Sequence, residues 1–274
     1  MSAVHPVLFQ IGSLLVPSYG VLAALGVLAA LVAAQWAAPR AGLDPRHGWN
    51  ALVLGVFAGM AVSRLLLIAV NVGDLQRHPQ WLLALALVHH PLLTAAGALG
   101  AAAAMAGYGR WARVPLPQLA DALAGPVALG MALEQIGCLM AGSDYGRDAG
   151  ASLPWGVVYT SPLAARWSGT PLGVTLYPAQ GYAALGALLT AALCAGWLVW
   201  KRDRRTGELS GVWLMAMGAN VFLSEGFRDW EGRGVVHWRG YGAVADAPQL
   251  VGLGMVMVGG VMLAEWGRRR SATA

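Results

Sequence analysis

Seven long apolar stretches take up most of this chain. They cover residues 18–36, 50–70, 81–106, 116–140, 179–200, 209–225 and 248–266. In an α-helix, about 20 apolar residues cross the ~30 Å hydrocarbon core of a bilayer. Inside that core the backbone must satisfy its own hydrogen bonds, and a helix does so within a single stretch. We therefore predict an all-α integral membrane protein with about seven transmembrane helices.

The composition agrees with a membrane protein. Hydrophobic residues make up 57% of the chain and charged residues 11%, whereas about 25% of the residues in a soluble domain are charged. The third stretch is interrupted by His89, His90 and Pro91, a pattern typical of a re-entrant piece followed by a helix. For the two histidines, a solvated place near the outer surface is favoured over catalysis.

The chain lacks a convincing internal repeat, so we expect one domain over residues 1–274. Many transporters are built from inverted halves, and the missing repeat counts against that class. A transporter or channel would also need a polar path through the bilayer. Asp121 and Glu134 are too few acidic residues to make such a path attractive.

The positive charges predict the orientation. With the N-terminus outside, the segments 37–49, 107–115, 201–208 and 267–274 are cytoplasmic and carry eleven Lys and Arg residues, against six in the outer segments. This bias follows the positive-inside rule and places the C-terminus in the cytoplasm. The net charge of +5 then reflects topology and contact with anionic lipid of the bilayer. No nucleic-acid partner is expected, because no basic patch is interleaved with aromatic residues.

Several kinds of chemistry are not expected. Residues 1–17 contain no Lys or Arg, so a cleavable signal peptide is not predicted. Cys138 and Cys194 lie in or at the ends of apolar stretches, which argues against a disulfide framework. Metal-ligand spacings such as CxxC and HExxH are missing, so neither a metal nor a cofactor is predicted. For Cys138, a packing role is favoured over that of a nucleophile.

Polar residues at membrane depth are the candidates for function. A central Arg or Asp costs roughly 2.5–3.5 kcal/mol on insertion scales, so such residues are rarely kept without a reason. Arg64 has a structural alternative, a buried ion pair with Asp121 or Glu134. Glu225 and Arg228 are spaced i, i+3 and can pair, either as part of a site or as an interfacial pair at a helix end.

The segment Glu134–Tyr159 contains the motifs IGC, AGxxYG and LPWGVV in this order. It resembles the signature of the bacterial prolipoprotein diacylglyceryl transferases, and the resemblance extends over nearly the whole chain. Further matching positions are Ser18-Tyr19-Gly20, Arg64, Asn71, Gly97, Gly100, Pro178, Gln180, Tyr182, Glu225, Arg228 and Gln249.

The chain departs from the family pattern at several positions. The phosphate-binding arginine of the family is Gln135 here, and a second arginine of the family is Val221. The His/Tyr-Gly-Gly start of the third span reads Ala95-Ala96-Gly97. The remaining differences from the pattern are Cys138, Tyr177 and Ala183.

The resemblance implies transfer of a diacylglyceryl group from phosphatidylglycerol, or a related anionic phospholipid, to the thiol of a lipobox cysteine in a lipoprotein precursor. It also implies a multi-pass protein of the bacterial cytoplasmic (inner) membrane, with a polar outer loop between the fourth and fifth spans. Arg64 and Arg228 would bind the phosphate, and Glu225 would orient Arg228. The substrate site would be lined by Tyr19, Gln135, Cys138, Asp144, Tyr145, Gly146 and Gln180.

Two interpretations remain open at this point. Either the chain carries out the transfer with a reduced set of arginines, or it is a relative that binds phospholipid or lipoprotein precursor without this turnover. An active enzyme needs a group that removes the thiol proton. The sequence offers Glu134, Asp144, His89 and His90 for that role.

Overall fold

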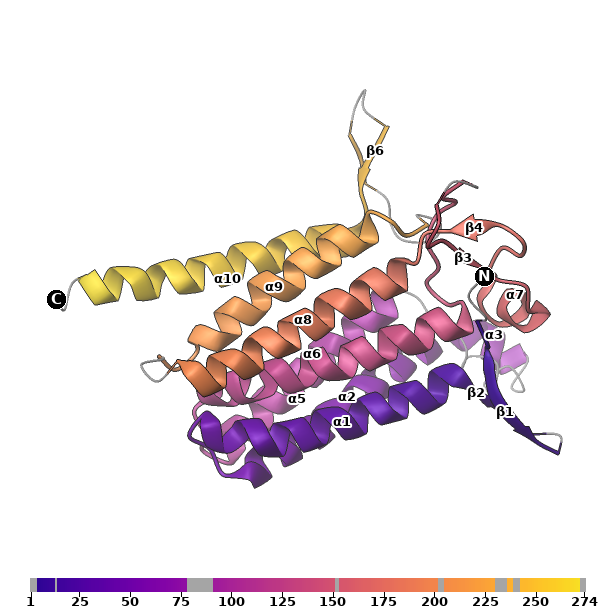
Figure 1. The fold of residues 1–274 in the computed structure, drawn as a ribbon. Coiled ribbons are helices and arrows are strands. Elements are labelled where there is room, and N and C mark those ends of the chain that lie inside the picture. The colour runs from indigo at the N-terminus through magenta and orange to yellow at the C-terminus, as the bar shows by residue number, and fades with distance from the viewer. Residues whose placement is uncertain are drawn as a thin grey trace.

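A computed structural model of the protein describes residues 4–12, 14–77, 91–150, 153–201, 205–229, 236–238 and 242–271. Long helices run side by side, and short strands and helices gather at one end of them (Figure 1). The elements in chain order are β1 (Val7–Ile11), β2 (Leu14–Pro17), α1 (Ser18–Arg40), α2 (Pro45–Val70), α3 (Val72–Arg77), α5 (Pro91–Trp111), α6 (Leu116–Ala141), β3 (Val157–Val158), α7 (Pro162–Ser168), β4 (Thr175–Leu176), α8 (Ala179–Trp200), α9 (Glu208–Glu225), β5 (Val236–Trp238), β6 (Gly242–Ala245) and α10 (Ala247–Ser271).

The described residues contain six helices that are long and apolar enough to cross a membrane: α1, α2, α5, α6, α8 and α10. This confirms a helical, multi-pass membrane protein. The stretch predicted as a sixth span also forms a helix, α9, but α9 is not among these six. It has 18 residues with a glutamate at each end, so the count of seven spans stays a prediction.

The helix bounds agree with the apolar stretches at most places. For the third stretch, α5 begins at Pro91, as the sequence pattern suggests. The expected re-entrant piece, with His89 and His90, lies outside the described residues.

Helix α6 lies at the centre of the bundle and contacts α1, α2, α5, α8 and α9. Its closest approach to α1 depends on two glycines. A Cβ atom on Gly26 would lie 2.8 Å from the carbonyl oxygen of Gly130, so the two backbones touch. Small residues allow such contacts between membrane helices, where packing replaces the hydrophobic effect as the driving force. The core between α1, α2 and α6 consists of Ala30, Leu31, Ala34, Ala51, Leu52, Val114, Leu119 and Leu123.

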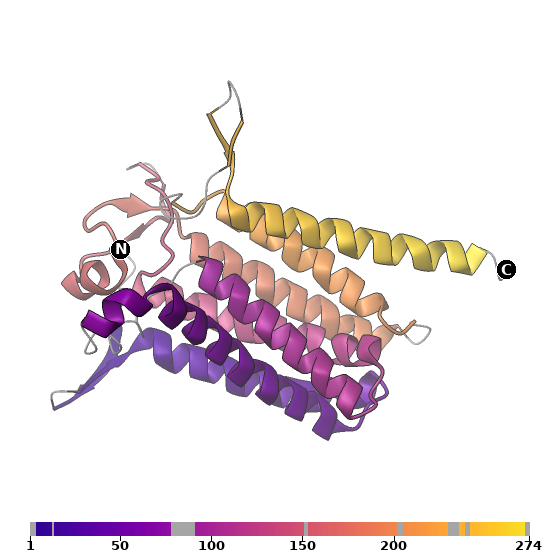
Figure 2. The same ribbon diagram turned by 180° about the vertical axis from the view of Figure 1, so that it is seen from behind.

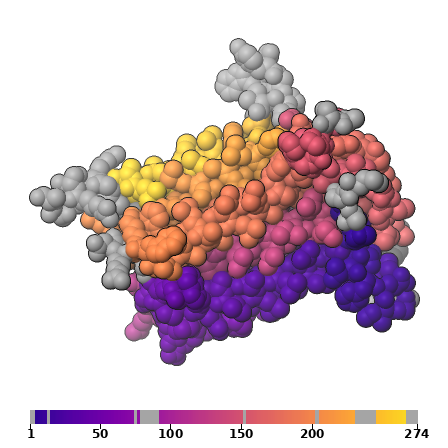
Figure 3. Space-filling model, viewed as in Figure 1, coloured from indigo at the N-terminus to yellow at the C-terminus, as the bar shows by residue number. Residues whose placement is uncertain are grey.

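The two ends of the bundle differ. The antiparallel pairs β1–β2, β3–β4 and β5–β6 lie with α3 and α7 at one end, which we call the cap end. The C-terminus of α10 lies at the opposite end (Figure 2). In the space-filling view, the indigo N-terminal residues and the pink-to-orange residues after α6 form the surface of the cap end (Figure 3).

Residues 142–178 connect α6 to α8 at the cap end. A polar outer loop was expected between the fourth and fifth spans, and that description of the segment stays a prediction. That the cap end faces the outside of the cell stays a prediction from the charge distribution of the sequence.

Candidate functional site

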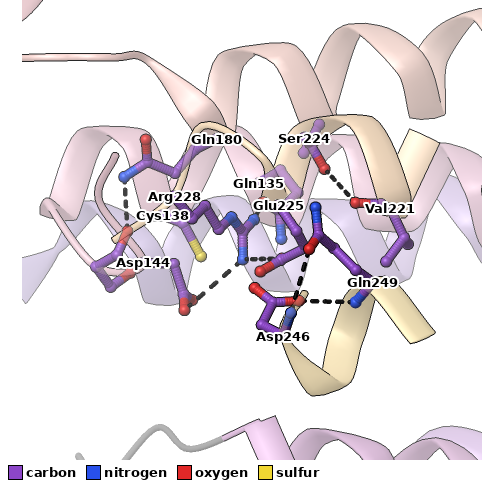
Figure 4. A network of polar contacts seen from close by, with 12 residues as sticks. Gln135, Cys138, Asp144, Gln180, Val221, Ser224, Glu225, Arg228, Asp246 and Gln249 are labelled. Atoms are coloured by element: carbon purple, nitrogen blue, oxygen red, sulfur yellow. Dashed lines mark hydrogen bonds and ion pairs between the residues drawn. The ribbon is translucent and has the colours of Figure 1, made fainter. Parts of the chain in front are cut away.

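The guanidinium of Arg228 is the centre of a polar network at the cap end (Figure 4). Its Nη1 atom lies 3.1 Å from Oε1 of Glu225 and 3.8 Å from Oδ1 of Asp144. Its Nη2 atom donates a 2.6 Å hydrogen bond to Oε1 of Gln135. Side chains from α6, from the loop after α6 and from the end of α9 therefore meet at one cation.

This network is buried. Arg228 is 7% exposed and Glu225 is 5% exposed. Glu225 and Arg228 do form the i, i+3 pair that the sequence predicted, but the pair is enclosed by protein instead of lying exposed at an interface. Buried charges persist only when paired and hydrogen-bonded. Among the described residues, the buried Nε of Arg228 has no hydrogen-bond partner.

A second set of contacts continues from Gln135 along α6. Nε2 of Gln135 donates to Oε2 of Glu134 at 2.7 Å. The thiol of Cys138 donates to Oε1 of Glu134 at 3.2 Å. Cys138 is fully buried, so it packs inside the protein, as the favoured interpretation had it, and it also binds a carboxylate.

Tyr19 and Arg64 approach this network from α1 and α2. The hydroxyl of Tyr19 interacts electrostatically with Glu134, Asp144 and Arg64. The structure thus brings the predicted residues of the first, second and fourth spans to one region. Tyr19, Arg64 and Glu134 are each half-buried.

The expected structural partners of Arg64 have other contacts. The carboxylate of Asp121 accepts hydrogen bonds from the backbone N–H groups of Gly207 and Ser210 at 2.6 and 2.8 Å. It thereby binds the N-terminal turn of α9. No ion pair joins Glu134 to Arg64 within the described part of the chain.

The loop after α6 runs between the end of α9 and β4. Gly142 ends α6 in the left-handed region, with φ of 85°. The N–H of Arg147 donates to the carbonyl oxygen of Phe227 at 3.0 Å, and the N–H of Tyr177 donates to that of Arg147 at 3.1 Å. These bonds attach the loop to the backbone on either side of it, next to Arg228.

At Gly146 the backbone of this loop forms an isolated antiparallel β-bridge with Arg228. A Cβ atom there would lie 2.1 Å from the carbonyl oxygen of Tyr177. No other residue fits without moving the backbone. The preceding Asp144 has φ of 53°, a left-handed conformation that Asp adopts more readily than most residues.

Two predicted substrate-site residues support this loop. Nε2 of Gln180 donates to the carbonyl oxygen of Ser143 at 2.7 Å, and Gln180 is 1% exposed. Tyr145 packs against the apolar cluster of Val157, Tyr159, Ala164 and Leu176. In this structure, both residues face protein.

Sequence reasoning missed Tyr159 and Asp246, which help to hold the cap end together, and it did not predict the contact that Gln249 makes there. Tyr159 donates to the carbonyl oxygen of Leu139 at 2.9 Å, and burial raises the pKa of its hydroxyl. Asp246 and Gln249 exchange hydrogen bonds at the start of α10, from the N–H of Gln249 to Oδ1 and from the N–H of Asp246 to Oε1. A polar residue three positions before Gln is a capping-box pattern, so the sequence did contain a signal for this pair.

Three of the positions that are predicted to depart from the family pattern, Ala95, Gln135 and Val221, differ in their surroundings. Ala95 is exposed on α5, and Val221 is half-buried on α9. Of the three, Gln135 alone is bonded to Arg228. Within the described residues, no group of three or more His, Cys, Asp or Glu side chains could hold a metal ion.

An apolar groove of about 430 Å³ lies between α8 and α9. It reaches Phe227, the residue before Arg228. The phenyl ring of Phe227 meets the ring of Tyr182 edge to face, with 5.0 Å between centroids. The residues that line the groove include Leu185, Leu189, Leu193, Asn220 and Leu223.

Comparison with known proteins relates the sequence of this chain to one family. The family model described as prolipoprotein diacylglyceryl transferase matches residues 6–265. Among curated proteins, the phosphatidylglycerol–prolipoprotein diacylglyceryl transferase of Paracidovorax citrulli is 30% identical over 291 residues, covering 98% of this chain and 97% of the relative. The protein of the same name from Polaromonas sp. is 29% identical and covers 99% of this chain and 96% of the relative. That from Clostridium tetani is 26% identical and covers 81% and 85%.

Proposed function

The chain belongs to the prolipoprotein diacylglyceryl transferase family, and from this premise we propose that it transfers a diacylglyceryl group from phosphatidylglycerol to the cysteine thiol of a lipoprotein precursor. The names of its relatives support the donor and the acceptor. In the proposed reaction the thiol sulfur replaces the phosphate ester oxygen at the glycerol carbon, and glycerol phosphate leaves.

The observation that carries the proposal is the position of Arg228. Its guanidinium is held by Glu225 at 3.1 Å and by Gln135 at 2.6 Å, and its buried Nε has no hydrogen-bond partner among the described residues. A preorganised cation stabilises a departing phosphate far better inside a protein than in water. We assign Arg228 and Arg64 to the phosphate, with Glu225 fixing the orientation of Arg228.

The remaining predicted residues take supporting roles in the proposal. Tyr19, Gln135 and Asp144 border the headgroup, because their polar atoms meet at the network around Arg228. Cys138 acts through Glu134, to which its thiol is bonded. Residues of the connecting loop and α8 maintain the shape of the site: Tyr145, Gly146 and Gln180.

The apolar groove between α8 and α9 supports a lipid substrate. An acyl chain in this groove would place its headgroup end near Phe227 and therefore near the residue that binds phosphate. The proposed setting is the bacterial inner membrane, with one domain over residues 1–274 and α9 as a seventh span. The cap end would face outward, where the precursor is presented.

A second candidate function is favoured by the substituted positions. Gln135 occupies the place of a family arginine and accepts a hydrogen bond from Arg228, whereas an arginine there would bring a second full charge. With Val221 in place of another arginine, the chain would bind phospholipid or precursor without turnover. We favour the enzyme, because the network around Arg228 is retained.

Turnover in liposomes separates the two functions. The purified protein would receive phosphatidylglycerol labelled in its acyl chains together with a lipobox peptide. We expect labelled peptide with the unaltered protein and at least a 100-fold slower reaction with Arg64→Ala, as is typical when one preorganised charge is removed. The matched control is Arg166→Ala, since Arg166 is exposed on α7 at the same end. Copurifying lipid without any labelled peptide would establish the binding protein instead.

A further inference from the structure

Transfer to a thiol requires removal of the S–H proton, because the thiolate is the nucleophile. The network around Arg228 contains three carboxylates that could receive it. They are Glu134, Asp144 and Glu225, and their contacts differ enough to distinguish them.

Two of the three are bound to Arg228. Glu225 lies 3.1 Å from Nη1 and is buried, and Asp144 lies 3.8 Å from the same atom. Oε1 of Glu225 and Oδ1 of Asp144 thus both lie beside the guanidinium. We therefore assign these two acids to holding Arg228 in place.

Glu134 has a different environment. Within the described residues, no Lys, Arg or His lies within ion-pair distance of it. Its two oxygens accept from neutral donors, the amide of Gln135 and the thiol of Cys138. It is half-buried, so part of the residue remains accessible.

The contact with Cys138 shows that a thiol fits against this carboxylate. Sγ of Cys138 lies 3.2 Å from Oε1 of Glu134, one helical turn away on α6. An incoming cysteine that approached the same oxygen would meet the geometry that this internal thiol already has. The carboxylate is also one residue from Gln135, which touches Arg228 at 2.6 Å, so the proton acceptor and the phosphate-binding cation are neighbours.

The geometry points to Glu134 as the general base of the proposed transfer, an assignment that rests on the proposed function. The thiol proton passes to the Glu134 carboxylate, and the sulfur forms a bond to the terminal glycerol carbon of the diacylglyceryl group. The bond between that carbon and the phosphate ester oxygen breaks. Its electron pair leaves with glycerol phosphate beside Arg228, and Glu134 returns its proton to water.

Two acceptor peptides test this assignment, one with cysteine and one with selenocysteine at the lipobox position. A selenol ionises far more readily than a thiol, so its reaction does not need a strong base. For Glu134→Gln we expect kcat with the cysteine peptide to fall by about 10²–10⁴, the usual contribution of general-base catalysis, with little change in KM. With the selenocysteine peptide the fall should be less than about tenfold.

Glu265→Gln is the matched control, since Glu265 is an exposed glutamate of α10 near the C-terminus. Glu134→Asp keeps a carboxylate and should retain more activity than Glu134→Gln. Equal losses with both peptides would overturn the assignment and indicate a structural role, and so would an unchanged rate with cysteine. Absence of product from the unaltered protein would instead overturn the proposed function itself, and the assignment with it.

Discussion

At the scale of single residues, the site depends on how charges are compensated. Arg228 contacts two carboxylates and one amide, and the nearest carboxylate, on Glu225, is as buried as the guanidinium. A guanidinium is suited to this place because it presents several donors in a fixed plane. Gln135 is predicted to stand in the place of a family arginine. Its amide accepts a hydrogen bond from Arg228 and donates one to Glu134.

Replacing Arg228 with alanine should therefore affect stability and activity together. The change would leave Glu225 buried without its cation, and breaking a buried pair typically costs about 3–5 kcal/mol. Arg228→Lys keeps the charge but loses the planar fork, so it should stay folded and lose about 100-fold in turnover. Thermal melting in detergent and the liposome assay would check both variants. An Arg228→Ala protein that melts like the unaltered one would contradict the buried-pair account.

At the scale of elements, the site forms because the loop after α6 is hydrogen-bonded to the segments that follow α9 and α7. Residues 145–149 are hydrogen-bonded to the exit of α9 on one side and to β4 and its neighbours on the other. Gly146 makes this possible because its Cα lies against the backbone of Tyr177. The loop therefore fixes the position of Arg228, three residues after the end of α9.

Gly146→Ala should disrupt this attachment. The added Cβ would need to move the carbonyl oxygen of Tyr177, from which it would be 2.1 Å away. We expect a lower melting temperature and at least a tenfold loss of turnover, with the helices intact by circular dichroism. Gly150→Ala serves as a comparison, since Gly150 has φ of 70° but nothing within 4 Å of its Cβ position. A smaller effect of Gly146→Ala than of Gly150→Ala would show that close approach is unimportant.

The N-terminus of α2 offers a pH-dependent prediction. Asp44 accepts from the side chain and the backbone N–H of Arg46, and these bonds lower the pKa of its carboxyl to about 2. Because the folded pKa is below the unfolded one, Asp44 stabilises the fold above about pH 4. That contribution is lost as the pH falls through about 2.

Asp44→Asn should expose this dependence, because Asn still caps a helix but carries no charge. We expect a small decrease in melting temperature at pH 7, since the pair is exposed. The difference from the unaltered protein should shrink between pH 4 and pH 2. A difference that stayed constant over this range would mean that the charge of Asp44 does not contribute.

At the scale of the whole molecule, the two ends of the bundle carry different sets of charged residues. The cap end holds the network around Arg228. The opposite end carries most of the Lys and Arg residues of the helix connections, among them Arg40, Arg110 and Lys201. This distribution is what the positive-inside rule expects of a cytoplasmic end.

Labelling of introduced cysteines in whole cells would test the topology. Arg166→Cys at the cap end should react with a membrane-impermeant reagent, whereas Thr206→Cys between α8 and α9 should react only after permeabilisation. If α9 crosses the membrane, Thr206 and a C-terminal tag lie on the same side, because two spans separate them. Opposite sides would mean six spans. Reaction of Thr206→Cys in intact cells would reverse the predicted orientation.

Local sequence determined much of this protein. Apolar length against bilayer thickness predicted where the long helices lie, and the observed starts of α1, α6 and α8 agree with the predicted ones. The spacing of Glu225 and Arg228 predicted their pair, since residues three apart share a helix face. Such features depend on residues that are close in sequence, so they can be predicted without knowing the tertiary structure.

Tertiary structure alone decided which polar residues meet. Gln135 and Arg228 are 93 positions apart and are joined by a hydrogen bond of 2.6 Å, while Asp121, on the same helix as Gln135, binds the start of α9. Gln180, predicted to bind substrate, holds the backbone of Ser143. The physical reason is that membrane helices all look alike in hydropathy, whereas their packing partners and rotations depend on the contacts of small residues across the bundle.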